Sequence, residues 1–530
     1  MLITNNPITE NLITNNLITN HLITNNLKNI TIMKKIALAF LQIFLICGVS
    51  NAQSASDVLR FSAVQNSSTA RSLGVGNSMS VLGGDFSAIS INPAGLAGFR
   101  SSDLTVSFGY SSVNNETKSI LNQIPNERVS NKITFNNVGL VLASQPFNEG
   151  SNWKTSNFAV GLNKLANFKE NVSYKYNDLK DRSLVRNFRD RANKGEFDPF
   201  GIELAFETGA IYEFTNNKGV KELGTDFDVE PFSSTYTQST ERSGYVNELV
   251  FAYAGTYKDK LSLGATIGVP FAQYEVNNIY NEVSIEKKSP FNSLNFKETY
   301  ILDGTGVNLK IGAIYRPIQL LRLGLAIHTP TAYSFSDNSI TELTYNYREA
   351  GVDKSSRAQS PDRNIQYALS TPWKFIGSAG FLFGKNGFLT AEVEYVDYRN
   401  GRLRFTQTDT ISASDQQYLI QRESEINNDV KTELKSAINI RLGGEFAYDI
   451  FRLRAGVNIL GATQEINNTA RQIYTLGAGI RGKSIFLDLA YSYLNQNYSS
   501  NPELVGTVRP IAIDITGQKS NFVATLGFKF

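Results

Sequence analysis

The chain has 530 residues, a formal net charge of +3 and 41% hydrophobic residues, and its mean hydropathy is -0.21. This balance argues against a bundle of transmembrane helices, because a long apolar run occurs only near the N-terminus. The small net charge gives no support to nucleic-acid binding. The remaining apolar residues are therefore expected to be spread over many short segments.

The first 32 residues form a low-complexity segment in which the pentapeptide Leu-Ile-Thr-Asn-Asn recurs at Leu2, Leu12 and Leu22. We interpret residues 1–32 as translated upstream sequence and Met33 as the true start. This leader is excluded from fold reasoning, because a short polar repeat gives no apolar face that could pack.

Residues 33–52 have the organisation of a secretion signal. Two lysines are followed by an apolar core over residues 36–47, and Ser50-Asn51-Ala52 forms a small-residue cleavage site. Cleavage before Gln53 is expected, so the protein is predicted to be exported from the cytoplasm of a Gram-negative bacterium.

The only cysteine of the chain, Cys47, lies inside this signal. Ile46 directly before it and Phe44 three residues before it fit a lipidation site poorly, so no lipid anchor is expected. The mature protein would contain no cysteine, which excludes disulfides and thiol catalysis.

Residues 53–102 lack the alternation of a β-strand and are rich in small residues. Small residues let backbone segments approach closely, and Asn92-Pro93 marks a turn. The segment is predicted to fold as a compact plug, here called the hatch, inside the lumen of a β-barrel formed by residues 103–530.

Fourteen segments beyond the hatch alternate apolar and polar residues with the period of two that is typical of β-strands. The predicted strands lie near residues 103–110, 132–143, 157–165, 247–257, 260–268, 307–315, 321–328, 374–383, 387–396, 436–446, 451–459, 472–480, 484–493 and 521–529. An even number of strands with both ends on one side is typical of a bacterial transmembrane β-barrel. The predicted fold class is therefore all-β.

Short and long connections alternate along these strands, and a soluble β-sandwich, the alternative fold, does not require this order. The short connections are expected to face the periplasm, and they lie at Asp259, Arg316–Leu320, Gly384–Asn386, Tyr448–Ile450, Arg481–Lys483 and the somewhat longer Ser144–Ser156. The long connections are expected to be extracellular loops, above all residues 166–246, 269–306, 329–373 and 397–435.

The polar faces of the later strands carry charges, which suits a wet lumen inside an apolar outer surface. The candidate lumen charges are Glu392, Glu394, Arg441, Glu445, Arg452, Arg454 and Asp488. Glu392 and Glu394 would allow acid–base chemistry, although neutralisation of facing arginines is the simpler role. Glu445 and Arg452 are predicted to form a cross-strand pair.

The residues leave little room for an enzyme. Beyond His21 in the leader, His328 is the only histidine, and it lies where a predicted strand meets an outer loop. A Ser–His site or a histidine-rich metal site would need it, and we interpret it as an ordinary strand-end residue. No phosphate loop, zinc spacing or EF-hand pattern stands out, so no cofactor or metal is expected.

Several motifs carry a resemblance to a known family. The run from Arg71-Ser72-Leu73-Gly74 through Asp85-Phe86-Ser87-Ala88 to Asn92-Pro93-Ala94-Gly95-Leu96 resembles the hatch of the FadL/OmpP1/TodX family of outer-membrane transporters for hydrophobic compounds. Thr371-Pro372-Trp373 and residues 389–398 are similar to a later hairpin of that family. The family fold is also a fourteen-stranded barrel, whereas the outer segments of this chain depart from the family, above all residues 166–246.

The resemblance implies passive uptake of hydrophobic molecules such as long-chain fatty acids. They would be captured at the extracellular loops, pass to a lumen pocket and leave sideways near the third strand, where Gly161 and Asn163 are candidate residues of a kink. The candidate hatch and ligand contacts are Phe61, Leu73, Phe86, Asn92, Pro93, Ala94, Leu96 and Phe99. Plain packing of the plug is the alternative role of these side chains.

Two further functions stay open at this point. The same hatch-and-barrel fold occurs in a type IX secretion component that shuttles secreted proteins, which would make the loops a protein-binding surface. An open porin for polar solutes is the third possibility. The expected partners are hydrophobic small molecules and outer-membrane lipid, without nucleic acid, and the barrel is expected to act as a monomer.

Overall fold

A computed structural model describes residues 55–530 apart from residues 66–68, 120–125, 145–150, 180–182, 197, 217–218, 230–232, 287–288, 407–412 and 501–512. The predicted leader, the predicted signal peptide and Cys47 lie outside the described residues. Within the described part of the chain, no helix combines the length and the apolar character needed to cross a membrane.

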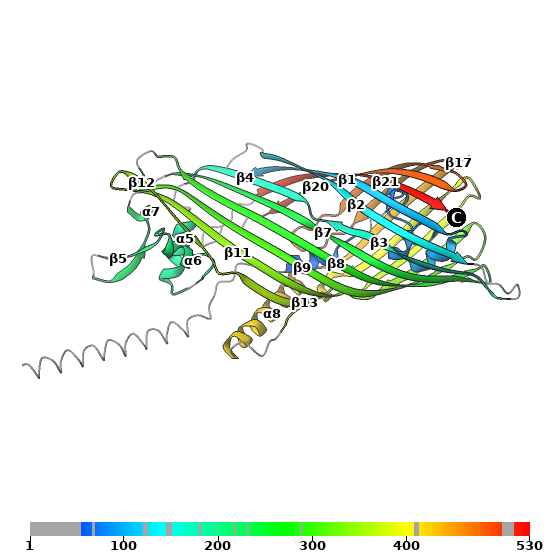
Figure 1. Ribbon diagram of the computed structural model, residues 1–530, viewed down its shortest axis with the longest axis horizontal. Coiled ribbons are helices and arrows are strands. Elements are labelled where there is room, and N and C mark those ends of the chain that lie inside the picture. Colours follow the sequence, from blue (N-terminus) through cyan, green and yellow to red (C-terminus); the bar gives the residue numbers. More distant parts are fainter. Residues whose placement is uncertain are drawn as a thin grey trace, which may run out of the picture.

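The chain is built mainly from strands, with short helices before and between them (Figure 1). The helices are α2 (Ala55–Ser62), α3 (Ala70–Gly74), α4 (Ala88–Ile91), η1 (Pro93–Gly98), α5 (Leu184–Asn193), α6 (Ile202–Glu207), α7 (Asp226–Val229), η2 (Tyr398–Asn400) and α8 (Ala413–Glu433). The strands are β1 (Asp103–Ser119), β2 (Asn126–Ser144), β3 (Trp153–Asn167), β4 (Glu170–Leu179), β5 (Tyr212–Thr215), β6 (Lys221–Gly224), β7 (Ser234–Tyr257), β8 (Leu261–Ser284), β9 (Phe291–Tyr315), β10 (Leu321–His328), β11 (Ala332–Glu349), β12 (Val352–Gln359), β13 (Arg363–Ser370), β14 (Lys374–Leu382), β15 (Gly387–Asp397), β16 (Arg402–Phe405), β17 (Ser436–Tyr448), β18 (Phe451–Leu460), β19 (Arg471–Arg481), β20 (Ile485–Ser500) and β21 (Ile513–Lys529).

The strands form a closed antiparallel barrel, because β1 pairs with β2 on one side and with β21 on the other. Four strands of the wall are interrupted, and each is counted here as one strand. They are β3 with β4, β10 with β11, β12 with β13 and β14, and β15 with β16. The described residues therefore form a fourteen-stranded barrel, and the predicted fold class and strand positions are confirmed.

The period of two explains the two faces of the wall. On β21, Phe522, Leu526 and Phe528 are exposed on the outside, whereas Val523 and Thr525 are buried on the inside. Apolar side chains face lipid and polar side chains face the lumen, as expected for a barrel that crosses a membrane. The predicted tight turns are also present, and the turn after β7 has Lys258 and Asp259 at φ 48° and 53°.

Two of the four predicted long loops, residues 269–306 and 329–373, are wrong as loops because most of their residues extend the strands, whereas residues 166–246 and 397–435 carry helices as well as strand ends. The extracellular placement of all four segments stays a prediction. β7, β8 and β9 have 24, 24 and 25 residues, whereas about 9–11 tilted residues cross a membrane. Residues 269–306 are a long hairpin, and residues 329–373 are mostly the strands β11, β12 and β13. Beyond the bilayer the outer face of a strand contacts water and no longer needs apolar side chains, so the alternation weakens while the backbone pairing continues.

A separate group of elements, here called the cap, lies at the end of the barrel opposite the C-terminus (Figure 1). It consists of α5, α6, α7 and the β5–β6 hairpin, and it occupies part of the predicted loop 166–246. Its buried residues Val185, Phe188 and Ile202 share one hydrophobic cluster with Phe291 of β9 and Tyr345 of β11. The cap is thus packed onto the extended strands.

The barrel is lower on one side. β17, β18 and β19 have 13, 10 and 11 residues, so their outer ends stop far below those of β7–β9. We call this side the low rim. Helix α8 lies beside it and packs on β16, where Asn427 Nδ2 donates to Leu403 O at 2.8 Å and Asn427 Oδ1 accepts from Leu403 N at 3.0 Å.

The predicted hatch lies inside the lumen. Helix η1 contacts β3, β7, β8 and β9, whereas α3 contacts β18, β19, β20 and β21 on the opposite side of the wall. Helix α3 begins after Thr69, whose side chain accepts a hydrogen bond from Ser72 N, which satisfies a free amide at the helix start.

Candidate functional site

The hatch is held by hydrogen bonds from its backbone to the inner wall. Ala70 N donates to Thr525 Oγ1 at 2.8 Å, and Thr266 Oγ1 donates to Ile89 O at 2.9 Å. Asn157 Nδ2 donates to Leu96 O at 2.8 Å. Polar wall positions thus satisfy hatch backbone groups that would otherwise be buried without partners.

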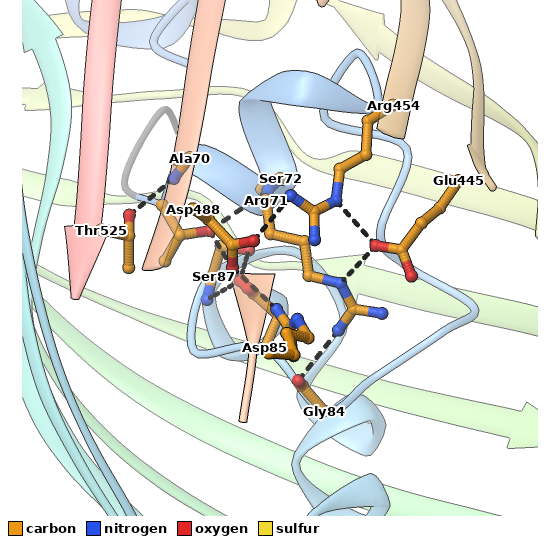
Figure 2. Close-up of polar contacts among 12 residues, drawn as sticks. Ala70, Arg71, Ser72, Gly84, Asp85, Ser87, Glu445, Arg454, Asp488 and Thr525 are labelled. Carbon is orange, nitrogen blue, oxygen red and sulfur yellow. Dashed lines mark hydrogen bonds and ion pairs between the residues drawn. The ribbon is translucent and has the colours of Figure 1, made fainter. Parts of the chain in front are cut away.

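Arg71 joins the hatch to the charges of the wall (Figure 2). Its Nε donates to Glu445 Oε2 at 3.3 Å, and its Nη1 donates to Gly84 O at 3.0 Å. Burial disfavours the charged guanidinium, but the carboxylates of Glu445, Asp85 and Asp488 outweigh it and raise the pKa of Arg71 above its ordinary value.

The predicted pair of Glu445 with Arg452 is wrong, because Glu445 faces Arg454 across the β17–β18 hairpin. Arg454 Nε donates to Glu445 Oε2 at 2.7 Å, whereas Arg452 donates to the carbonyl of Asp449. The turn between Tyr448 and Phe451 has two residues, which shifts the register by two positions.

The other predicted lumen charges also form ion pairs. Arg454 lies 2.7 Å from Asp488, and Arg441 donates to Glu392 at 2.5 Å and to Glu394 at 3.1 Å. Glu392 Oε2 also accepts from Ser80 N of the hatch at 3.2 Å. These carboxylates therefore neutralise arginines and tie the hatch to the wall.

A further buried ion pair, between Glu248 and Lys310, was not found by sequence reasoning. Lys310 Nζ donates to Glu248 Oε1 at 2.6 Å, and Ser90 Oγ of the hatch donates to the other carboxylate oxygen at 3.3 Å. Glu248 and Lys310 both occupy inward positions of predicted strands, and these positions are the sequence signal that could have revealed the pair. Next to the pair, His328 Nε2 lies 2.8 Å from Ile91 O, so this histidine contacts the hatch.

The Asn92-Pro93-Ala94 turn fits closely against β9 and β10. Asn92 Oδ1 accepts from Ala94 N at 3.1 Å, and Asn92 Nδ2 donates to Ala313 O and Leu325 O, each at 3.3 Å. A Cβ atom on Gly312 would lie only 1.8 Å from Asn92 Oδ1, so only glycine leaves space for this turn.

The predicted apolar hatch contacts lie in three separate places. Phe61 lies in an aromatic group with Phe335, at a ring-centre distance of 4.6 Å, and with Phe168 and Tyr333. Phe86, Leu96 and Phe99 pack against β2, β3 and β7, and Leu73 packs against β20 and β21. The structure does not bring these residues to one pocket, and their role as ligand contacts stays a prediction.

Gly161 and Asn163 lie at the inner face of β3. A Cβ atom on Gly161 would lie 2.4 Å from the ring of Phe86, so the glycine leaves room for that ring. Asn163 accepts from Asn137 Nδ2 at 2.8 Å and donates to Ser90 Oγ at 2.8 Å.

The pairing of β2 with β3 ends at Asn137 and Asn163, although β2 continues along β1 to Asn126. We call the region beyond this pair the wall gap. β3 bulges against β7 between Lys164 and Ala166, so it turns away from β2 at this point. A strand that loses its neighbour in this way leaves a local break in the wall.

The outer edge of the wall gap is apolar and its inner edge is polar. Ile133 and Phe135 of β2 are 79% and 41% exposed on the outside, whereas Thr134 and Asn136 are buried. Lys164 reaches across and donates to Thr134 Oγ1 at 2.8 Å and to Asn136 Oδ1. Asn163 lies ~23 Å above the start of β3 at Trp153, for a rise of ~3.3 Å per residue and a tilt of ~45°, near the outer edge of the apolar band.

A cavity of about 230 Å³ lies behind the wall gap. The cationic side chains that line it are Arg60, Lys164, Arg471 and Lys519, and no Asp or Glu occurs among its described lining residues. Leu73 is the only candidate hatch contact that lines this cavity. A smaller cavity of about 80 Å³ lies beside Glu248, Lys310 and His328. No cluster of potential metal ligands occurs in the described part of the chain.

These features define a class of protein, a transmembrane β-barrel of fourteen strands with an N-terminal hatch in its lumen. The chain shares its fold with the crystal structure of a Pseudomonas aeruginosa FadL homologue, with a TM-score of 0.53 and 14% sequence identity, covering 88% of this chain and 98% of that chain. It also shares the fold of TodX, the toluene transporter of Pseudomonas putida, with a TM-score of 0.50 and 10% identity, covering 88% of this chain and 99% of that chain. No family model and no curated protein matches the sequence. The resemblance to the FadL/TodX type of barrel is confirmed as a likeness of fold.

Proposed function

We propose that this protein is a non-enzymatic channel of the outer membrane for the passive uptake of hydrophobic compounds such as long-chain fatty acids. The observation that carries the proposal is the position of the larger cavity between the hatch and the wall gap. The hatch and its polar anchors fill the lumen below the cavity. A ligand in the cavity therefore has a short sideways path to the bilayer and no comparable path to the periplasm.

The chemistry of the cavity favours an amphiphile with an anionic head group. Lys164, Arg471 and Lys519 lie along a cavity that has no carboxylate in its described lining. A carboxylate in this place would gain charge-assisted hydrogen bonds, which are stronger in a poorly hydrated site than in water. Neutral hydrocarbons would not use these cations.

The low rim provides the route into the cavity. Leu460 is the last residue of β18 and Arg471 is the first residue of β19, and both line the cavity. A molecule captured at the extracellular side would thus pass the low rim, while the cap covers the high side. Lateral release keeps the apolar tail out of water, which is the physical reason for a sideways exit.

The proposal is tested by equilibrium binding of labelled hexadecanoate to the purified protein in detergent. Lys519→Met is expected to weaken binding about tenfold or more, since a charge-assisted hydrogen bond contributes roughly 1.5–3 kcal/mol. Lys385→Met is the matched control, because Lys385 is exposed in the turn after β14 and lies away from the cavity. Failure of the wild type to bind hexadecanoate and a neutral hydrocarbon would refute the proposal and favour the protein-shuttle alternative.

Conductance in planar bilayers tests the porin alternative. The hatch residues Phe61, Phe86 and Leu96 are almost fully buried in the lumen. A barrel filled in this way is expected to show no steady ionic current. A large stable conductance of the wild type would instead support a porin for polar solutes.

A further inference from the structure

We propose that Lys164 is a latch that holds the wall gap closed, and that the anionic head group of a ligand in the cavity releases it. This inference rests on the proposed function and names the residue that regulates its exit step. The relevant observations are the end of the β2–β3 pairing, the contacts of Lys164 across that break, and the cavity behind it.

The position of Lys164 suits a latch. It directly follows Asn163, the last residue of β3 that pairs with β2, and it belongs to the bulge against β7. Its ammonium group contacts Thr134 and Asn136 on the facing strand. Lys164 thus joins the two edges with side-chain hydrogen bonds where the backbone ladder has ended.

The wall on the far side of the gap is also held by side chains. Arg128 Nε of β2 donates to Ser173 Oγ of β4 at 2.8 Å, and Thr117 Oγ1 of β1 donates to Ser173 O. Asn115 Nδ2 of β1 also donates to Asn171 O of β4 at 3.0 Å, so the break has an inner boundary at Asn163 and an outer boundary near Asn171. A movement of Lys164 can open the space between these boundaries without breaking a backbone ladder.

The partners of Lys164 across the gap are neutral oxygens. The bonds of the ammonium group to these oxygens are charge-assisted through the donor alone. A carboxylate adds the attraction of opposite charges, so it competes well for this ammonium group. Lys164 lines the same cavity as Arg471 and Lys519, and their positive charges attract the head group to its side of the wall. A ligand shifts the equilibrium between the closed and open states only if it binds one state more tightly than the other. A carboxylate binds the open state more tightly, because it pairs with the ammonium group that is released there.

The apolar outer edge of the gap suits the apolar tail of such a ligand. Ile133 and Phe135 are among the exposed apolar residues of β2 and flank Thr134. An apolar tail that moves out between the edges would exchange the cavity for the apolar band of the membrane. The latch would therefore open toward lipid when its ammonium group turns to the head group.

The test compares two probes of equal length, hexadecanoate and hexadecane, in transfer from the purified full-length protein to liposomes. Lys164→Met is expected to raise hexadecane transfer about tenfold, the effect of losing one charge-assisted hydrogen bond that favours the closed state. The same variant should lose the advantage of hexadecanoate over hexadecane. Lys519→Met should reduce hexadecanoate transfer without raising hexadecane transfer, and Lys385→Met should match the wild type.

A second variant keeps the cation and removes its partners. Thr134→Val with Asn136→Leu is expected to raise hexadecane transfer as Lys164→Met does, while hexadecanoate still binds. The latch is refuted if hexadecane transfer stays at the wild-type rate in both variants, since Lys164 would then contact only the head group. If Lys164→Met does not fold, the second variant alone decides between these outcomes.

Labelling of a thiol separates the latch from the proposed function. In a Cys47→Ser background, Leu165→Cys places a thiol in the cavity lining, and a maleimide confined to the bilayer reaches it through the gap. Without any ligand, Lys164→Met should label several-fold faster than the parent protein. Equal rates would overturn the latch. Faster labelling in a protein that binds neither probe would support the closing role of Lys164, and it would refute the proposed function together with release by a head group.

Discussion

Replacement of Lys310 by methionine is expected to destabilise the barrel strongly, because it leaves a carboxylate buried without its cation. Glu248 is 0% exposed, and its remaining partners are Asn308 Nδ2 at 3.0 Å and Ser90 Oγ at 3.3 Å. Breaking a buried ion pair by removing one partner costs about 3–5 kcal/mol. The two remaining hydrogen bonds offset part of this penalty, so a loss of about 3 kcal/mol in the free energy of unfolding is expected.

The double variant Glu248→Leu with Lys310→Met should recover most of this loss, because no unpaired charge stays buried. Unfolding in urea, with the barrel inserted in lipid vesicles, gives these free energies. Trp153 and Trp373 are the only tryptophans of the chain and report the transition by fluorescence.

An exposed ion pair provides the control for this prediction. Lys354→Met removes one partner of an exposed pair with Glu349, and no measurable change is expected. A loss below about 1 kcal/mol for Lys310→Met would show that Glu248 does not depend on this cation. A double variant as unstable as the single one would show that lost packing, and not charge, explains the effect.

Three further variants test the hatch and the cap. Arg71→Met should lower the free energy of unfolding by about 1–3 kcal/mol, less than Lys310→Met, because Glu445 keeps a second arginine partner; urea unfolding measures it. Gly161→Ala should displace the ring of Phe86 and cost about 1–3 kcal/mol in the same assay, and no loss would contradict the tight fit seen at this glycine. Phe188→Asp should expose the cap to limited proteolysis while the barrel stays protease-resistant, and cleavage of the barrel strands would contradict an independent cap.

The strands could be predicted because lipid and lumen impose opposite demands on neighbouring residues. Phe522 and Leu526 face lipid while Thr525 faces the hatch, so the alternation is strong along β21. The outer half of β8 carries Asn277 and Asn278 in succession, and this polar pair interrupts the alternation that marks a strand. The extensions were therefore missed for a physical reason, since the contrast between the two faces ends where the bilayer ends.

The candidate site was harder to predict, because it depends on register between distant strands. The pair of Glu445 with Arg454 follows from a turn of two residues, and an error of one residue in that turn moves every partner on β18. Lys164 meets Thr134 only because β2 has a bulge at Asn136 and β3 another at Leu165. Such irregularities leave no periodic signal in the sequence, whereas the hatch turn at Asn92 and Pro93 has a recognisable local pattern.

The polar attachment of the hatch bears on the proposed direction of transport. Arg71, Ser90 and Asn92 each form hydrogen bonds to wall residues that lie in different strands. Moving the hatch out of the lumen would break these bonds together and leave carboxylates such as Glu445 with fewer partners. In the proposed opening of the wall gap, Lys164 leaves two neutral oxygens. The smaller rearrangement is therefore the sideways one, which agrees with the proposed ligand, since a molecule that is apolar over most of its length has no need to enter the water of the periplasm.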